Sequence, residues 1–209
     1  MIADRHPFFF LRKLFDRSGA RFQFSRYVYT SDSLFDERET FEVAGTELTV
    51  EWLEAELGKL QANQELAIHS KVTIDGRTWH IPMIDFAAEQ IGPQQFDRIR
   101  AFLPRPVFST AAYYHSGRSF HAYSTRLLGP KEWHEFLGRL LLINPRDATE
   151  IVDTRWIGHR IIAGYCSLRF SSNTNQYRGM PRRIGIRAFV ENLGQSVTES
   201  QEESWAGVT

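Results

Sequence analysis

The sequence has a single cysteine, Cys166, and no apolar run long enough to cross a bilayer. One cysteine excludes a disulfide framework and the zinc modules built from several cysteines, and a membrane-spanning helix needs about 20 apolar residues. The N-terminal segment, MIADRHPFFFLRKLF, mixes charged residues with its aromatics and lacks a small-residue cleavage site, so it is a poor signal peptide. We therefore expect a soluble, cytoplasmic protein with no membrane partner.

Net charge is also absent, because 25 Lys and Arg balance 25 Asp and Glu. The charges are nevertheless segregated along the chain: residues 31–65 carry ten acids and two bases, whereas residues 151–190 carry seven arginines and one acid. The planar fork of arginine suits phosphate groups, so the basic block is either a surface that binds phosphate or a solvated face without a partner.

No repeat or Gly/Ser/Pro-rich linker divides the 209 residues, and 42% hydrophobic residues are sufficient for a packed interior. Hydrophobic spacing predicts helices over residues 4–17, 49–61, 93–103 and 131–144. Apolar or β-branched runs predict strands over residues 22–30, 65–74, 77–86, 107–114, 119–124, 149–153, 160–170 and 184–190, with a polar loop at 31–40.

The clearest local signal is Asp75-Gly76, which lies between the runs 65–74 and 77–86. This pair fits a tight hairpin turn, and Pro82 in the second run requires an edge or a bulge. Asp85 therefore falls at the end of a strand. Short links between strands, together with interspersed helices, predict an α+β fold with a mixed or antiparallel sheet and helices packed on it.

Four segments carry residues suited to chemistry: HIPMIDF with Asp85, SGRSFH over residues 116–121, EIVDTRW with Asp153, and LRFSSNTNQYRGMP over residues 168–181. Each also has an ordinary interpretation. Asp85 can cap a helix formed by FAAEQIG, His121 can be a core histidine, and Asp153 can pair with Arg155.

The order and spacing of these segments resemble the archaeo-eukaryotic primase superfamily, also called the primase-polymerase group. Its members carry an acidic motif at a strand end, a Ser-x-His element, a second acid and a later arginine-bearing segment. Here these are IDF, SGRSFHAY, VD and LRFSSNTN. The resemblance runs from about residue 65 to residue 183.

The resemblance implies a nucleotidyltransferase that binds a nucleoside triphosphate with Mg²⁺ or Mn²⁺ and primes or extends a DNA or RNA template strand. It assigns the metal to Asp85 and Asp153 and makes these acids and His121 catalytic. It assigns the nucleotide to Ser116, Gly117, Arg118, His121, Arg169 and Asn175. It also implies an RRM-like core over residues 65–190, preceded by an N-terminal α/β module over 1–64. The last 19 residues contain four acids, no Lys or Arg and many small polar residues, so we expect an acidic flexible tail over 191–209.

The sequence departs from the family pattern at the second acid of the first motif, where Ala87 stands and cannot bind a metal. Glu89 becomes usable as a metal ligand only if a helix begins at Phe86. Ser171-Ser172 replaces Pro-Gly, and Tyr177 stands where a Lys is common.

Several alternatives remain open. One is a catalytically degenerate relative that binds nucleotide or nucleic acid within a larger replication or defence complex, with a helicase or other accessory protein acting in trans. Another is an interaction domain whose acidic segment 31–65 docks a basic partner. A Ser116/His121/Asp153 hydrolase triad lacks its strand-turn-helix motif, and a zinc site from His115, His121, His134 or His159 lacks ligand spacing. Tyr113, Tyr114 and Tyr177 are candidate base-stacking residues.

Overall fold

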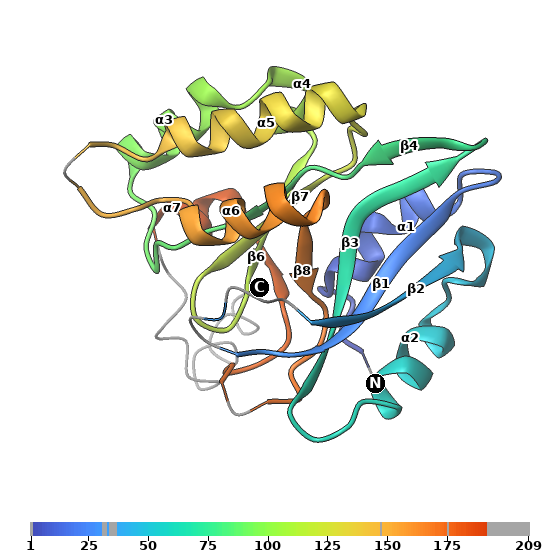
Figure 1. Cartoon of the computed structure of the whole chain (residues 1–209). Helices are drawn as coiled ribbons and strands as arrows, with labels where there is room; N and C mark the ends of the chain where they lie inside the picture. Colours follow the sequence, from blue (N-terminus) through green and yellow to red (C-terminus); the bar gives the residue numbers. More distant parts are fainter. Residues whose placement is uncertain (1, 31–32, 34–36, 147, 175, 192–209) are drawn as a thin grey trace, which may run out of the picture.

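The computed structural model describes every residue except 1, 31–32, 34–36, 147, 175 and 192–209 (Figure 1). Because residues 192–209 are not described, the predicted tail at 191–209 lies almost wholly outside the described residues. The structure confirms the α+β class, and the strands of both sheets pair in antiparallel fashion.

The first sheet has the order β2-β1-β3-β4, with β8 also paired to β3. Its strands are β1 (Arg21–Val28), β2 (Arg38–Ala44), β3 (Gln64–Ile74), β4 (Arg77–His80) and β8 (Ser167–Arg169). β4 pairs with residues 71–74 of β3, whereas β8 pairs with residues 67–69. Ser70 lies between them: its backbone N–H donates to the Cys166 carbonyl, and its own carbonyl accepts from Ile81 N, each at 2.7 Å. The same edge of β3 therefore pairs first with β8 and then, further along the strand, with β4.

The second sheet has the order β5-β7-β6-β9. Its strands are β5 (Met83–Asp85), β6 (Ala111–His115), β7 (Phe120–Ser124) and β9 (Arg182–Ile184). The hairpin at Asp75-Gly76 forms as predicted, with both residues at positive φ. The run 77–86 is not one strand, because Pro82 lies between β4 and β5, and these two strands belong to different sheets. Asp85 does end a strand, as predicted.

Helices cover both sheets (Figure 1). They are α1 (Pro7–Phe15), α2 (Val50–Gly58), α3 (Pro93–Phe102), α4 (Arg105–Ser109), α5 (Pro130–Ile143), α6 (Thr154–Ala163) and α7 (Ile186–Glu191), with a short 3₁₀ turn at Gly45–Glu47. The predicted apolar face of α5 is buried. A single hydrophobic cluster joins the cores of both sheets and includes residues from α1, β3, β7 and α5. Among the described residues no helix is long and apolar enough to cross a membrane.

Besides the run 77–86, several predicted elements are wrong in type or extent. Residues 105–109 form α4, so the strand predicted from 107 starts only at Ala111. Residues 154–163 form α6 between an Asp153 cap and Gly164, which has a φ of +76°, and only 167–169 of the predicted strand 160–170 are extended. The strand predicted at 184–190 is β9 followed by α7. β2 begins at Arg38, inside the predicted loop.

Candidate active site

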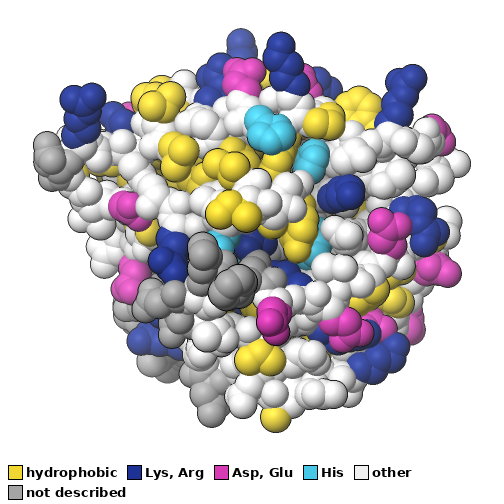
Figure 2. All heavy atoms as spheres, in the orientation of Figure 1, with side chains coloured by type: hydrophobic (Ala, Val, Ile, Leu, Met, Phe, Trp, Pro, Cys, Tyr) yellow, Lys and Arg dark blue, Asp and Glu magenta, His cyan; other side chains and the backbone are white. Residues whose placement is uncertain are grey.

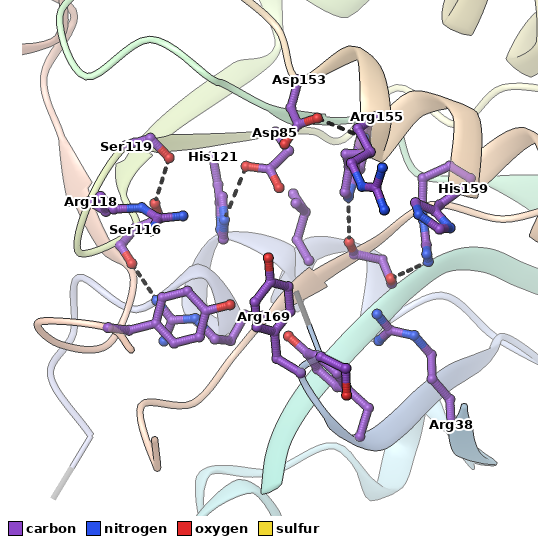
Figure 3. Close-up of a pocket in the computed structure, with 18 of the residues that line it drawn as sticks. Arg38, Asp85, Ser116, Arg118, Ser119, His121, Asp153, Arg155, His159 and Arg169 are labelled. Carbon is purple, nitrogen blue, oxygen red and sulfur yellow. Dashed lines mark hydrogen bonds and ion pairs between the residues drawn. The ribbon is translucent and has the colours of Figure 1, made fainter. Parts of the chain in front are cut away.

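A cavity of about 980 Å³ lies where β1 and β8 of the first sheet approach β5 and β7 of the second. The start of α6 and the turn between β6 and β7 close its sides. The cavity is lined by seven of the residues singled out from the sequence: Asp85, Glu89, Ser116, Arg118, His121, Asp153 and Arg169. Segments more than 80 residues apart thus converge, as Figure 3 shows.

Asp85 and His121 are cross-strand neighbours on β5 and β7. The Asp85 Oδ1 atom lies 3.6 Å from His121 Nε2. Burial, followed by the nearby Asp153 carboxylate, raises the pKa of Asp85 to about 8. Burial, followed by the charge of Arg169, lowers the pKa of His121 to about 3, so the imidazole is neutral at physiological pH. Its buried Nδ1 has no hydrogen-bond partner in the described structure.

Asp153 reaches the same cavity from the first turn of α6 rather than from the predicted strand 149–153. Only an isolated bridge, Phe86 to Val152, is extended there. The Asn144 side chain replaces a partner strand, because its oxygen accepts from Ile151 N (2.8 Å) and Val152 N (2.9 Å). Asp153 then caps α6: its Oδ1 accepts from Trp156 N at 2.7 Å, and its own backbone N–H donates to the Asp85 carbonyl at 3.0 Å.

Glu89 does not meet the condition set for it as a metal ligand, because no helix begins at Phe86. The amides of Ala87 and Ala88 instead donate to the Ile151 carbonyl, so Asp85 caps no helix there. Glu89 lines the cavity with an exposed side chain. Within the described part of the chain, no three His, Cys, Asp or Glu side chains form a group that could hold a metal ion.

The turn between β6 and β7 carries Ser116, Gly117 and Arg118. Ser116 N donates to the Ser119 carbonyl at 2.9 Å, and Gly117 N donates to His115 Nδ1 at 3.1 Å. Gly117 has a φ of +104°, and a Cβ added there would lie 3.2 Å from Arg178 N and 3.3 Å from the Gly179 carbonyl. Only glycine suits this position without strain. Figure 3 shows the Arg118 side chain beside Ser116 in the cavity.

Arg169 is almost completely buried, with 4% of its surface exposed. Its guanidinium donates to the carbonyls of Ser116, Ser171 and Gly179. The ring of Tyr177 covers it at 3.9 Å. These contacts tie β8 to the turn at Ser116 and to both ends of the segment 171–179. Asn175 lies outside the described residues.

A family comparison agrees with this arrangement of motifs. The family described as archaeo-eukaryotic primase 1D-like matches residues 44–182. The chain belongs to this primase-like family. The match includes Asp85, the Ser116–His121 element, Asp153 and Arg169, so the resemblance inferred from the motifs is confirmed.

Comparison with solved structures returns the catalytic domain of primase Repb' in complex with initiator DNA. It has 10% sequence identity and a TM-score of 0.48, and the match covers 82% of this chain and 79% of that chain. No curated protein matches the chain.

The cavity also contains residues outside the motifs IDF, SGRSFHAY, VD and LRFSSNTN. Its far wall carries four basic side chains, from β2 and α6: Arg38, Arg155, His159 and Arg160. Figure 3 shows Arg38, Arg155 and His159 on the opposite side of the carboxylates from Ser116. The three on α6 had a signal in the sequence, since residues 155–160 belong to the basic block, but the predicted strand 160–170 hid the helix that they share. Arg38 had none, because it lies in the acidic segment 31–65.

Of the three tyrosines predicted as candidate base-stacking residues, two lie in the core and one lines the cavity. Tyr113 and Tyr114 are core residues, with exposures of 3% and 0%, and Tyr113 stacks on Phe189 at 4.2 Å. Tyr177 lines the cavity together with Tyr29, and their ring centroids lie 6.4 Å apart. These two rings are therefore the better placed to meet a base.

Proposed function

We propose that this chain is a primase-polymerase that binds a nucleoside triphosphate with a divalent cation and primes or extends a nucleic-acid strand. The observation that supports this most directly is that two acids, a neutral histidine and a glycine-containing turn border one cavity. Membership of the primase-like family supports this reaction class.

The carboxylates fit a divalent cation in their chemistry. Mg²⁺ is commonly held by one or two carboxylates together with substrate phosphates, and Asp85 and Asp153 offer that donor set. Burial first, and then the nearby Asp153 carboxylate, raises the pKa of Asp85, so the charged form of this acid is costly in the cavity. A cation held by both carboxylates would offset that cost. When bound, Mg²⁺ or Mn²⁺ would neutralise charge on the phosphates and lower the pKa of an attacking hydroxyl.

The nucleotide's phosphates would lie at the turn on the other side of His121. The Arg118 guanidinium and the hydroxyls of Ser116 and Ser119 supply donors there, since a glycine turn lets the chain approach a phosphate closely. His121 is neutral, so one ring nitrogen carries a hydrogen and can donate to a phosphate oxygen. Arg169 would act mainly by holding this turn in place, because backbone carbonyls occupy its guanidinium.

The template or primer strand would pass along the far wall. Three arginines, Arg38 on β2 and Arg155 and Arg160 on α6, line the cavity there together with His159. Arginine side chains bind a phosphate backbone whatever its sequence. Two acids, Glu37 and Glu39, also line that end. Glu39 is paired with Arg26 at 2.9 Å.

The test is primer synthesis and extension with Mg²⁺ or Mn²⁺ in the wild type and in D85N, D153N and H121A. Loss of one metal-binding carboxylate should lower kcat/KM by about 100-fold or more, and loss of His121 should weaken triphosphate binding. The matched control is D97N, which changes an exposed aspartate on α3. Activity that is equal in the wild type, D85N, D153N and H121A would exclude this site.

A second candidate is a catalytically inactive relative that binds nucleotide within a larger replication or defence assembly. Ala87 and the failure of Glu89 to join the two aspartates within the described structure favour it. Metal-dependent triphosphate binding without incorporation would support this alternative over the polymerase.

A further inference from the structure

A second buried charge lies behind the proposed nucleotide pocket. Glu65 on β3 has no exposed surface, and in the described structure its carboxylate accepts hydrogen bonds from one short segment. The donors are the Ser171 hydroxyl, Asn173 N at 3.0 Å, Thr174 N at 3.0 Å and Thr174 Oγ1 at 2.9 Å. Residues 106 to 109 positions later in the chain thus satisfy this acid.

This arrangement restrains the segment strongly. A buried carboxylate is costly unless donors replace the water that it has lost. Residues 171–174 cannot move away from Glu65 without leaving that charge uncompensated. Ser171 is fixed further, because its Oγ also accepts from Leu66 N at 2.8 Å.

Arg169 restrains the same segment in the complementary way. Glu65 accepts from N–H and O–H groups of residues 171–174, whereas Arg169 donates to the carbonyls of Ser171 and Gly179. A buried acid and a buried base thereby hold one stretch of chain, which we call the clamp segment, residues 171–179.

The clamp segment packs directly against the turn proposed to hold phosphate. Arg178 N and the Gly179 carbonyl lie 3.2 and 3.3 Å from where a Cβ on Gly117 would be. Arg169 joins the Ser116 carbonyl to the same segment. Glu65 is thus connected to the turn through Ser171 and Arg169. The Ser171 hydroxyl donates to Glu65, and Arg169 donates to the carbonyls of both Ser171 and Ser116.

We propose that Glu65 is a positioning residue for nucleotide binding: by fixing the clamp segment it holds the Ser116–Ser119 turn in the shape that receives phosphates. This inference rests on the proposed function for the identity of the ligand. The position of the turn can be measured without any ligand.

The experiment compares E65A with E65Q. E65A removes the acceptors, so amide hydrogen exchange should accelerate over 171–181 and over 116–119. The dissociation constant for a nucleoside triphosphate with Mn²⁺ should rise about tenfold or more, because a displaced turn would lose about one charge-assisted contact with the phosphates. E65Q keeps one side-chain oxygen for the donors of residues 173 and 174 and should restore most of the affinity.

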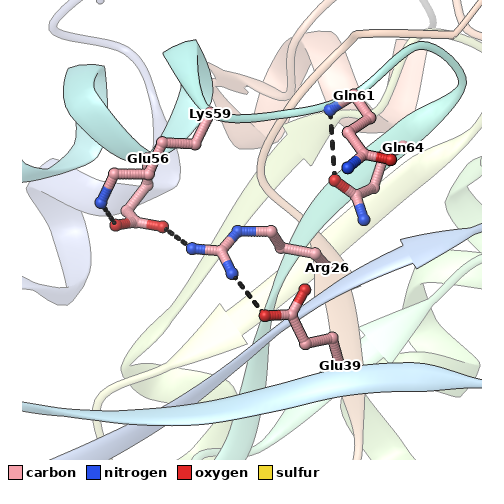
Figure 4. A network of polar contacts seen from close by, with 6 residues as sticks. All are labelled: Arg26, Glu39, Glu56, Lys59, Gln61 and Gln64. Atoms are coloured by element: carbon pink, nitrogen blue, oxygen red, sulfur yellow. Dashed lines mark hydrogen bonds and ion pairs between the residues drawn. The ribbon is translucent and has the colours of Figure 1, made fainter.

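The control is E56A, which also removes a buried glutamate, with an exposure of 5%. The Glu56 carboxylate pairs with Arg26 and Lys59 (Figure 4). The E56A substitution should lower the melting temperature of the protein without accelerating amide exchange at 116–119. If E65A does not fold, T174V removes a single donor from the clamp segment and should show the same local acceleration more weakly.

Unchanged exchange over 171–181 and 116–119 in E65A or T174V would overturn the inference, as would faster exchange with unchanged nucleotide affinity. A wild type that binds no triphosphate would contradict the proposed function instead. The exchange rates at 116–119 would then decide the role of Glu65 by themselves.

Discussion

Gly117 has a backbone conformation that residues with side chains rarely adopt, and it lies against a second piece of backbone. Its positive φ, and the short distances from a Cβ built on Gly117 to Arg178 and Gly179, both disfavour any side chain at this position. A side chain there requires both backbone strain and displacement of the clamp segment. Neighbouring Arg169 depends on the same geometry, because the carbonyl of Ser116 is one of its acceptors.

We expect G117A to lower stability by about 1–3 kcal/mol, the usual cost of a strained backbone position. It should also weaken triphosphate binding by more than the stability loss accounts for, because the turn itself must shift. Chemical denaturation and nucleotide titration measure the two effects separately. G138A is the matched control: Gly138 lies on α5 with no atom near a built Cβ, so this change should be neutral or slightly stabilising. Equal nucleotide affinity in G117A and the wild type would refute the phosphate role of the turn.

At the scale of elements, α1 is attached to the end of β8 by His6. This histidine is 3% exposed. Its Nδ1 accepts from Phe8 N at 3.2 Å, and its Nε2 contacts the Phe170 carbonyl at 2.7 Å. The ring is therefore neutral, with its hydrogen on Nε2, and burial lowers its pKa from 6.5 to about 4. Protonation of Nδ1 would remove the acceptor that caps α1.

This geometry predicts acid sensitivity. Below pH 6.5 the unfolded chain binds a proton at His6, whereas the folded chain does not until about pH 4. Stability from His6 is thus complete above pH 6.5 and decreases as the pH falls toward 4, by about 2 kcal/mol at pH 5. Unfolding free energies at pH 8 and pH 5 measure the loss. H6N keeps a cap acceptor but does not titrate, so it should lose less stability over the same interval. An identical loss in H6N would show that other groups cause the sensitivity.

Elements with local signals could be predicted from the sequence, whereas contacts between distant residues could not. The Asp75-Gly76 hairpin and the apolar face of α5 each depend on residues within a short window. α6 was missed because the adjacent β-branched residues Ile161 and Ile162 favour a strand locally, although Asp153 and Gly164 mark the ends of the helix. The contacts of Glu65 with residues 171–174 have no local pattern at all, since they link positions more than 100 apart.

For the molecule as a whole, a net charge of zero conceals a cavity with one acidic centre and basic walls. Figure 2 shows Lys, Arg and His side chains around the hollow on this face, below a group of hydrophobic side chains. The most exposed large apolar residues of α5 and α6 are Leu142, at 62%, and Ile162, at 77%. The arginine-rich C-terminal block supplies most of the basic wall, so the charge segregation in the sequence becomes a feature of one site.

Arg155 provides a test of this wall, because its exposed side chain lines the cavity. We expect R155Q to weaken binding of single-stranded oligonucleotides of any sequence. The slope of log K against log salt should become smaller by about 0.7, the value for one phosphate contact on a single strand. Fluorescence anisotropy over a salt series measures both. The control is R100Q, on α3 outside the cavity lining. Equal salt slopes in wild type and R155Q would remove this wall from the nucleic-acid path.

The late position of β8 in the chain has a consequence for biosynthesis. Residues 67–69 of β3 find their partners only at residues 167–169, so a ribosome must add about a hundred further residues before that edge can be covered. Until then the nascent chain presents an open strand edge, the kind of feature that invites pairing with other chains. Arg169 arrives with the same three residues, and therefore closure of this sheet edge and assembly of the pocket coincide.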